Sequence, residues 1–307
     1  HRCGKAVRGN RLIKAAPAVT TEPSVYFCAD DFGLDGQSCD NIAECVKNGV
    51  INKVSVFANS RLDDLSKRVA ALDGAVLCPH LNFVEGCCVG QKEKLTLLCD
   101  ENGIFKLTFA GLFLLSIFKR KRLQEEIFLE TSAQLERFFA LAGKNRPLFL
   151  DSHQHVHMIP PVLSAICGAA EKNGLSISYL RTPSEAAAPF LACPSLYLSC
   201  VSVNLIKQWL LKFLNLLNKK NYRRFGIKRA EFLGIMFSGN MTEERVERLL
   251  PKTTARAAKK GRDAEILFHP GFTDEELKSG VKFHGFYKSP GRKNEYNAAI
   301  NLKNKKA

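Results

Sequence analysis

The chain has 307 residues, of which 46% are hydrophobic, so it can bury a large core and form either two domains or one α/β barrel. Its net charge of +15 comes from 45 basic and 30 acidic side chains, and such an excess favours anionic partners. Much of this charge lies near the two ends and beside apolar stretches, which is not the pattern of a nucleic-acid groove, so no nucleic-acid partner is expected.

Cysteine spacing and the length of the apolar runs exclude two further classes. No paired C-x-x-C spacing repeats among the eleven cysteines, so a zinc ribbon is excluded and reduced, buried thiols are expected. No run reaches the roughly 18 uninterrupted apolar residues that a spanning helix needs. We therefore expect a cytoplasmic protein, with peripheral membrane contact kept as an alternative.

The sequence predicts three segments. Residues 1–23 are basic, contain two prolines and show no periodic apolar face, so they are expected to form a mobile tail. Residues 24–300 are expected to form one domain, and residues 301–307 a basic C-terminal tail.

Within the domain, short apolar runs alternate with helical patterns. Strands are predicted at Val25–Ala29, Val54–Ala58, Val76–Cys78, Leu148–Leu150, Ile177–Tyr179 and Ala264–Phe268. Helices are predicted at Ile42–Lys47, Leu65–Leu72, Leu123–Ala142 and Pro161–Asn173, and after the capping pattern that begins at Thr242. This alternation predicts the α/β class, as a single (β/α) barrel-like domain with a mostly parallel sheet and helical insertions.

Two apolar regions interrupt the alternation. Ile104–Phe118 is followed by four basic residues, and Leu205–Leu217 carries nine large apolar residues with lysines between and after them. We favour helices that pack on the barrel with their lysines at the solvent edge. The alternative is a basic amphipathic surface that rests on a membrane or lines a lipid-facing substrate groove.

Polar residues follow the predicted strands at four places. Asp30 and Asp31 come after the first strand, His80 after the third, Asp151 after the fourth and His269 after the last. Because the carboxyl ends of parallel strands form one edge, and active sites of α/β folds lie there, these side chains are expected to converge.

Asp151 opens a block in which three histidines alternate with other residues. In an extended stretch, residues two apart point to the same side, so His153, His155 and His157 are expected to direct their rings toward one spot. The alternative is a polar loop that happens to be rich in histidine.

One carboxylate and two imidazoles, from Asp31, His80 and His153, would form a ligand set that leaves positions on a divalent cation open. Open positions are typical of catalysis, and a cation that activates water and polarises a carbonyl oxygen predicts hydrolysis of an amide or ester. The neighbouring Asp30 can then accept a proton from water. No G-x-S-x-G elbow or P-loop is present.

These blocks carry a resemblance to a known family. The segments 29–33, 48–55, 80–86, 151–160 and 269–271 resemble the YdjC-like carbohydrate deacetylases, a group that includes chito-oligosaccharide deacetylase and a deacetylase associated with hopanoid biosynthesis. The resemblance spans about residues 25 to 275, and the histidine block is its most specific part. Cys28 and the pair Cys78 and Pro79 depart from the residues common in the family, which affects substrate choice more than the reaction.

The resemblance implies a barrel-like enzyme that removes the N-acetyl group from an amino sugar with one divalent metal ion, Mg or Zn. It implies Asp31, His80 and His153 as metal ligands and Asp30 as the proton acceptor. His269 is the candidate proton donor to the leaving amine. His155, His157 and Asn82 are the candidate substrate-binding residues.

The partner expected from this resemblance is an N-acetylated carbohydrate, either an oligosaccharide or a lipid-linked glycan. The alternative from another class is a non-catalytic barrel that binds a glycan or an anionic membrane surface. The oligomeric state is left open.

Overall fold

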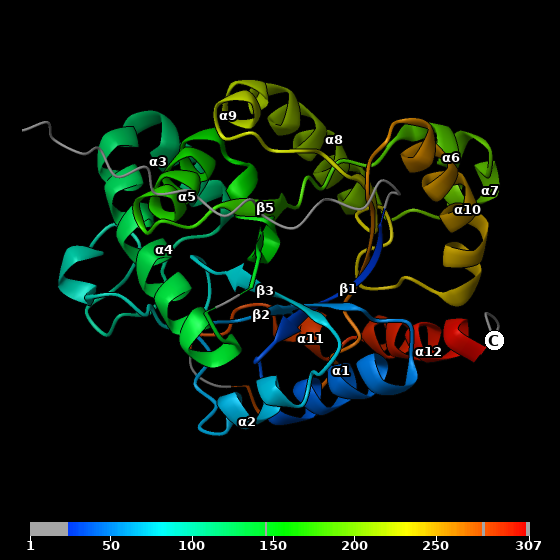
Figure 1. The fold of residues 1–307 in the computed structure, drawn as a ribbon, viewed down its shortest axis with the longest axis horizontal. Coiled ribbons are helices and arrows are strands. Elements are labelled where there is room, and N and C mark those ends of the chain that lie inside the picture. The colour runs from blue at the N-terminus through cyan, green and yellow to red at the C-terminus, as the bar shows by residue number, and fades with distance from the viewer. Residues whose placement is uncertain (1–23, 145, 278–279, 305–307) are drawn as a thin grey trace, which may run out of the picture.

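The computed structural model describes residues 24–144, 146–277 and 280–304. Seven parallel strands form one sheet in the order β5-β4-β3-β2-β1-β7-β6 (Figure 1). The strands are β1 (Val25–Phe32), β2 (Lys53–Val56), β3 (Val76–Leu81), β4 (Leu148–Ser152), β5 (Ile177–Leu180), β6 (Glu231–Leu233) and β7 (Ala264–Phe268). The predicted α/β class and parallel, barrel-like sheet are confirmed.

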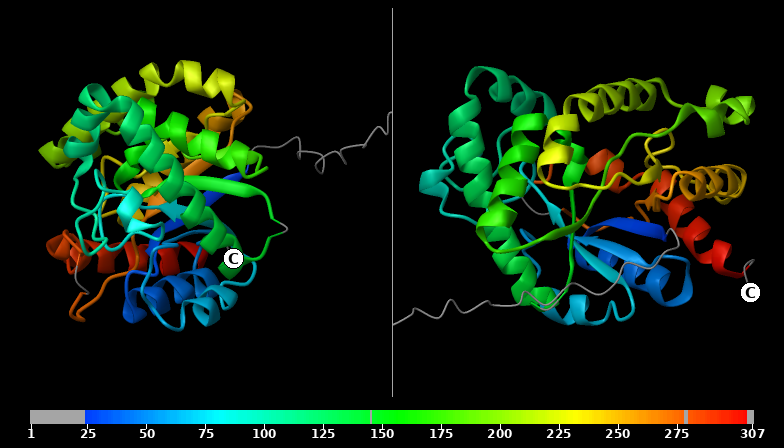
Figure 2. Two further views of the ribbon diagram at one scale, coloured as in Figure 1. Left: turned by 90° about the vertical axis from the view of Figure 1, so that its left-hand side faces the viewer. Right: turned by 45° about the horizontal axis from the view of Figure 1, so that its top comes forward.

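The sheet curves into a half-barrel with helices around it (Figure 2). Its two edges approach each other where Glu185, which follows β5, forms a parallel bridge with Phe232 of β6. The longer surrounding helices are α1 (Gly36–Asn48), α4 (Arg120–Ala142), α5 (Pro160–Lys172), α8 (Ser202–Leu217), α10 (Glu243–Lys259) and α12 (Pro290–Asn304). Because every strand pair is parallel, the carboxyl ends of all seven strands lie at the same end of the half-barrel.

Several element boundaries differ from those predicted. The first strand continues to Phe32, so Asp30 and Asp31 belong to the end of β1 itself. Helix α1 begins well before Ile42 because the side chain of Asp35 accepts a hydrogen bond from the backbone N–H of Ser38 and caps the helix. Helix α10 begins where predicted, but Thr242 makes no side-chain capping hydrogen bond.

The prediction for the C-terminal tail is wrong in part. Residues 301–304 form the last turn of α12, where Leu302 is buried in the main hydrophobic core. Core packing of this apolar side chain extends the helix beyond the predicted domain end. Residues 305–307, and the whole predicted N-terminal tail at 1–23, lie outside the described residues.

Both apolar insertions contain helices, as expected. The first forms α3 (Phe109–Phe118) and the second forms α8. Short helices complete the chain at α2 (Leu65–Ala70), α6 (Ala187–Leu191), α7 (Pro194–Leu198), α9 (Lys219–Arg224) and α11 (His284–Tyr287). Among the described residues, no helix combines the length and apolar character needed to cross a bilayer. The ten cysteines in the described ranges are free, and eight are buried, as predicted.

Glu185 makes the stability of the fold depend on pH. Burial raises the pKa of Glu185 to about 7, although the backbone N–H groups of Gly234, Ile235 and Met236 donate to its carboxylate and oppose the shift. An acid whose pKa is raised by folding contributes fully below its ordinary pKa of 4.5, and this contribution is lost as the pH rises through 7.

We therefore expect the free energy of unfolding of the wild-type chain to fall by about 3 kcal/mol relative to that of Glu185→Gln as the pH rises from below 4.5 to above 7. Denaturant unfolding of both proteins across this pH range measures the difference. Parallel stability curves would contradict the assignment.

Candidate active site

The carboxyl ends of β1, β3 and β4 bring one carboxylate and two imidazoles together. The ligand atoms of Asp31, His80 and His153 lie within 4.8 Å of one another, and all three side chains are buried. Asp31 Oδ1 lies 3.6 Å from His80 Nε2 and 3.2 Å from His153 Nδ1. The structure therefore assembles the three residues that the sequence suggested as metal ligands.

Carboxylates on the far side of each ring orient the two imidazoles. His80 Nδ1 donates to Asp151 Oδ1 over 2.7 Å, which leaves Nε2 to face Asp31. His153 Nε2 lies 3.4 Å from Glu85 Oε2 and 3.3 Å from the hydroxyl of Tyr287, which leaves Nδ1 for the same spot. A carboxylate behind a histidine is the usual arrangement at metal centres, because it fixes the tautomer and strengthens the ligand.

Asp31 supplies two further signs of a functional site. Its Oδ1 atom is buried without a hydrogen-bond partner, whereas Oδ2 accepts from Arg292 Nη1 over 2.9 Å. Its backbone φ of 69° is left-handed, which is uncommon for a residue other than glycine and is often found at active sites. An unsatisfied carboxylate oxygen between two oriented imidazole nitrogens fits a divalent cation.

The charges of the cluster also favour a cation. Burial acts to lower the pKa of His80, but the carboxylates of Asp30 and Asp151 outweigh it and raise the pKa to about 10. Burial acts to raise the pKa of Asp31, but Arg292 and the two histidines hold it well below its usual range. The carboxylates thus remain ionised and attract positive charge between them.

Asp30 is held by an arginine that the sequence analysis missed. Arg181, which follows β5, donates from Nη1 and Nη2 to the two oxygens of Asp30 over 2.6 and 2.7 Å. The same guanidinium lies 2.9 Å from Asp151 Oδ2 and 2.7 Å from Glu265 Oε1. Burial acts to raise the pKa of Asp30, but Arg181 and then His80 lower it, so this carboxylate stays ionised.

Removal of Arg181 is expected to destabilise the fold strongly. An Arg181→Met variant would leave three buried carboxylates that lose their shared guanidinium, although Lys53 stays 3.1 Å from Glu265 and His80 stays 2.7 Å from Asp151. Breaking a buried ion pair in this way costs about 3 to 5 kcal/mol. Arg68→Met, which removes ion pairs with two partly exposed aspartates, is the matched control and should cost less than about 1 kcal/mol. Urea unfolding compares them, and equal losses would refute the prediction.

The extended conformation predicted for the histidine block is wrong. Residues His153–Met158 form a 3₁₀ segment with left-handed backbone at Gln154 (φ 52°) and His155 (φ 58°). The chain turns directly after β4, so the three rings separate and only His153 reaches Asp31.

The other two histidines differ in their surroundings. His157 lies away from the cavity, because Nδ1 contacts Ser152 Oγ at 2.6 Å and Nε2 donates to the carbonyl of Arg181 at 3.0 Å. His155 borders the cavity, and its Nδ1 is buried without a partner. Burial, followed by the charges of Lys207 and Arg181, lowers the pKa of His155 well below its usual value, so this ring is neutral.

A cavity of about 650 Å³ is bordered by the cluster of Asp31, His80 and His153. Asp30, Asp31, His80, His153 and His269 all contribute to its wall. Aromatic and aliphatic side chains supply most of the remainder, namely Phe109, Val201, Val203, Ile206, Leu210, Leu211, Phe283, Phe286 and Tyr287. The volume lies within the range of small-molecule sites, about 300 to 1,000 Å³.

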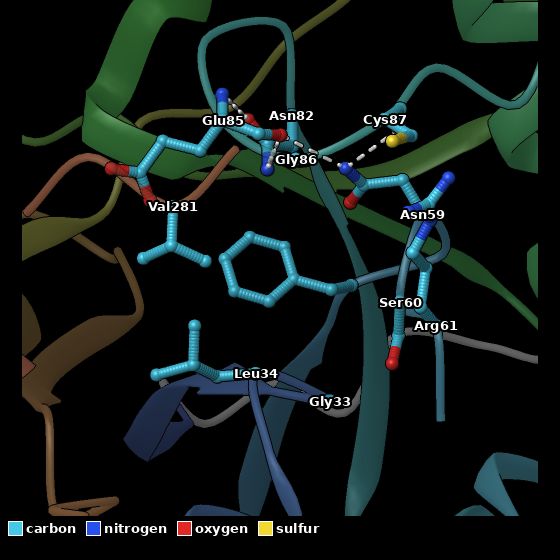
Figure 3. A pocket seen from close by; sticks show the side chains of 11 residues that line it. Gly33, Leu34, Asn59, Ser60, Arg61, Asn82, Glu85, Gly86, Cys87 and Val281 are labelled. Atoms are coloured by element: carbon cyan, nitrogen blue, oxygen red, sulfur yellow. Dashed lines mark hydrogen bonds between the residues drawn. The ribbon is translucent and has the colours of Figure 1, made fainter. Parts of the chain in front are cut away.

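Asn82 does not border this cavity. Its amide donates to the carbonyl of Glu85 over 2.9 Å, and its carbonyl accepts from the backbone of Val84 and Glu85, both at 3.1 Å. Figure 3 shows it beside a separate pocket of about 50 Å³ that also contains Asn59. Asn82 therefore stabilises the loop that contains Glu85, whose carboxylate lies beside His153.

Sequence analysis also missed other residues that build the site. Arg292 and Glu295 lie on α12, where Arg292 donates to Asp31 and Glu295 accepts from the backbone N–H of His269. Lys53 and Glu265 lie inside β2 and β7 and form a buried ion pair at 3.1 Å. Lys53 and Glu265 could have been found, because each is a charged residue in an apolar strand. No local sequence pattern indicated Arg292 and Glu295.

The fold and the site together define an α/β barrel-like protein with a carboxylate and imidazole cluster suited to a divalent cation. The chain belongs to the family described as YdjC-like protein, whose family model matches residues 24–306. The resemblance seen in the sequence is therefore confirmed.

Three relatives illustrate the similarity. A carbohydrate deacetylase of Danio rerio is 33% identical over 162 residues, which cover 51% of this chain and 48% of that protein. A chitooligosaccharide deacetylase of Escherichia fergusonii is 29% identical over 153 residues, covering 48% and 56%. A carbohydrate deacetylase of Mus musculus is 26% identical over 253 residues, covering 80% and 76%. The aligned part of the chain spans about half the length of the first two relatives.

One solved structure supports the fold. A protein of Enterococcus faecalis V583, named for a proposed cleavage of cellobiose phosphate, superposes with a TM-score of 0.60. It is 22% identical, and the match covers 92% of this chain and 95% of that one. At this identity the likeness concerns the fold alone.

Proposed function

We propose that this protein is a metal-dependent hydrolase that removes the N-acetyl group from an acetylated amino sugar, either an oligosaccharide or a lipid-linked glycan. The observation that carries the proposal is the convergence of Asp31, His80 and His153 on one spot in the wall of a ligand-sized cavity. The names of the relatives supply the substrate class.

Asp31 Oδ1, His80 Nε2 and His153 Nδ1 would hold the cation. When bound there, a divalent ion such as Mg²⁺ or Zn²⁺ would lower the pKa of coordinated water and polarise the acetyl carbonyl. Asp151 and Glu85, behind the two imidazoles, keep the ligand nitrogens directed at this position.

Asp30 is the proposed proton acceptor. It borders the cavity beside Asp31, and Arg181 holds its carboxylate in one orientation. As water attacks the acetyl carbon, Asp30 takes a proton from it. The carbon–nitrogen bond then breaks, and acetate leaves.

His269 is the proposed donor to the departing nitrogen. It follows β7, borders the cavity, and has its Nδ1 3.5 Å from Glu295 Oε2. A carboxylate at one ring nitrogen orients the imidazole, so that it can deliver a proton and release the free amine. His155 and the aromatic wall border the cavity and are the proposed sugar-binding groups.

Acetate release tests the proposal. The protein is incubated with a panel of N-acetylated oligosaccharides and glycolipids, first after chelation and then with Mg²⁺ or Zn²⁺ added. We expect acetate and free amine in equal amounts with metal and neither after chelation. Glycan binding that persists after chelation, with no acetate under any condition, would favour a non-catalytic barrel instead.

A further inference from the structure

Helix α8 is apolar on two faces. Gln208, Leu211 and Leu214 pack inward, as expected for a helix on a barrel. The opposite face carries large apolar side chains that are 36% to 69% exposed, namely Val203, Ile206, Trp209, Leu210, Phe213, Leu216 and Leu217. Single exposed apolar residues are ordinary, but a continuous face of them marks an interaction surface. The expectation of a helix with a solvent-facing lysine edge therefore does not describe this face.

Helix α3 extends the same surface. Its Phe109 and Phe113 pack with Leu211 and Leu214 of α8 in one hydrophobic cluster, so the two helices lie close together. Both lie on one side of the barrel (Figure 1). The exposed large apolar residues of α3 are Leu114, Ile117 and Phe118. We call these three residues, with the seven of α8, the apolar face.

The two sequence segments that carry the apolar face contain no acidic residue. Neither segment 102–124 nor segment 186–230 includes an aspartate or a glutamate. Their basic residues are Lys106, Lys119, Arg120, Lys121, Arg122, Lys207, Lys212, Lys219, Lys220, Arg223, Arg224, Lys228 and Arg229. Exposed apolar side chains with basic neighbours are typical of helices that lie on anionic bilayers, whereas a second copy would bring like charges together.

The apolar face is continuous with the active-site cavity. Val203, Ile206 and Leu210 are exposed at the surface and also border the cavity that contains Asp31 and His153. A flat surface that covers α8 would therefore also meet the mouth of the cavity.

We propose that the apolar face docks on an anionic lipid bilayer, with the mouth of the active-site cavity at the bilayer surface. Apolar side chains enter the boundary between headgroups and acyl chains, and the surrounding lysines and arginines pair with anionic headgroups. This inference depends on the surface and not on the proposed reaction, so either can fail alone.

The chain contains its own reporter for this contact. Trp209 is the only tryptophan and is 66% exposed on the apolar face. Adding vesicles of phosphatidylcholine and phosphatidylglycerol is expected to shift its emission to shorter wavelength, and acyl-chain brominated lipids should quench it. The response should weaken at high salt and with phosphatidylcholine alone, because the headgroup attraction is electrostatic.

A variant with Phe118→Ser, Phe213→Ser and Leu216→Ser keeps Trp209 and the cavity wall. Its vesicle affinity should fall about tenfold or more, since three exposed apolar side chains that would enter the bilayer are lost. Leu129→Ser, an exposed apolar residue on α4, is the control and should bind as wild type does. Circular dichroism checks that each variant is folded.

Two results would overturn the proposal. One is an unchanged Trp209 emission when folded wild-type protein meets the anionic vesicles. The other is a blue shift that grows with protein concentration without lipid, with a dimer detected by light scattering, which would assign the apolar face to a second copy of the chain.

Discussion

An Asp30→Asn variant is expected to release acetate about a thousandfold more slowly than the wild type, because an amide cannot accept the proton of the attacking water. The cation affinity should change little, since the proposed ligand atoms belong to Asp31, His80 and His153. Acetate release and bound metal are measured on the same sample. Normal acetate release by this variant would show that another group accepts the proton.

The substitution also weakens the contact with Arg181, so a control for folding is required. Asp35→Asn is matched in chemistry and lies in the adjacent loop, where Asp35 caps α1 through Ser38. Asp35→Asn should lower the free energy of unfolding by about 1 kcal/mol or less, without the loss of acetate release expected for Asp30→Asn. Equal losses of activity in both variants would point to misfolding rather than catalysis.

An Asp31→Asn variant is expected to lose cation affinity by about a hundredfold or more, and acetate release with it. Asparagine tolerates the left-handed backbone at this position, so the change removes the charge while the main chain is kept. Calorimetric titration with Mg²⁺ and Zn²⁺ measures the affinity. Tight binding of both ions by this variant would exclude Asp31 as a ligand.

His157→Gln is the control for this experiment. It lies in the same histidine block as His153, but its ring nitrogens contact Ser152 and the carbonyl of Arg181 instead of the cavity. The folded variant should therefore keep the wild-type cation affinity. Together, the Asp30 and Asp31 variants separate proton transfer from cation binding. Asp30→Asn should lose acetate release while it still binds the cation, whereas Asp31→Asn should lose both.

Local patterns made much of the sheet predictable. Asp30, His80 and Asp151 follow short apolar runs near the ends of β1, β3 and β4, and polar residues at the ends of such runs indicate the active edge of a parallel sheet. For this reason Asp31, His80 and His153 could be grouped without coordinates. The resemblance to the family was seen in the same blocks, and the family model matches residues 24–306.

Other parts of the site depend on contacts that local patterns do not encode. β6 has only three residues and no apolar run of its own, so its place at the sheet edge comes from pairing with β7. Arg292 reaches Asp31 across 261 positions of sequence. Alternation of histidines predicted a strand, but the left-handed conformations of Gln154 and His155 end β4 and turn the chain.

The most direct test of the central claim is a titration of chelated, metal-free protein in which bound cation and acetate release are followed together. We expect that one equivalent of a divalent cation binds per chain, that acetate release from an N-acetylated amino sugar rises in proportion, and that Asp31→Asn abolishes both. Full acetate release from the metal-free protein would contradict this expectation.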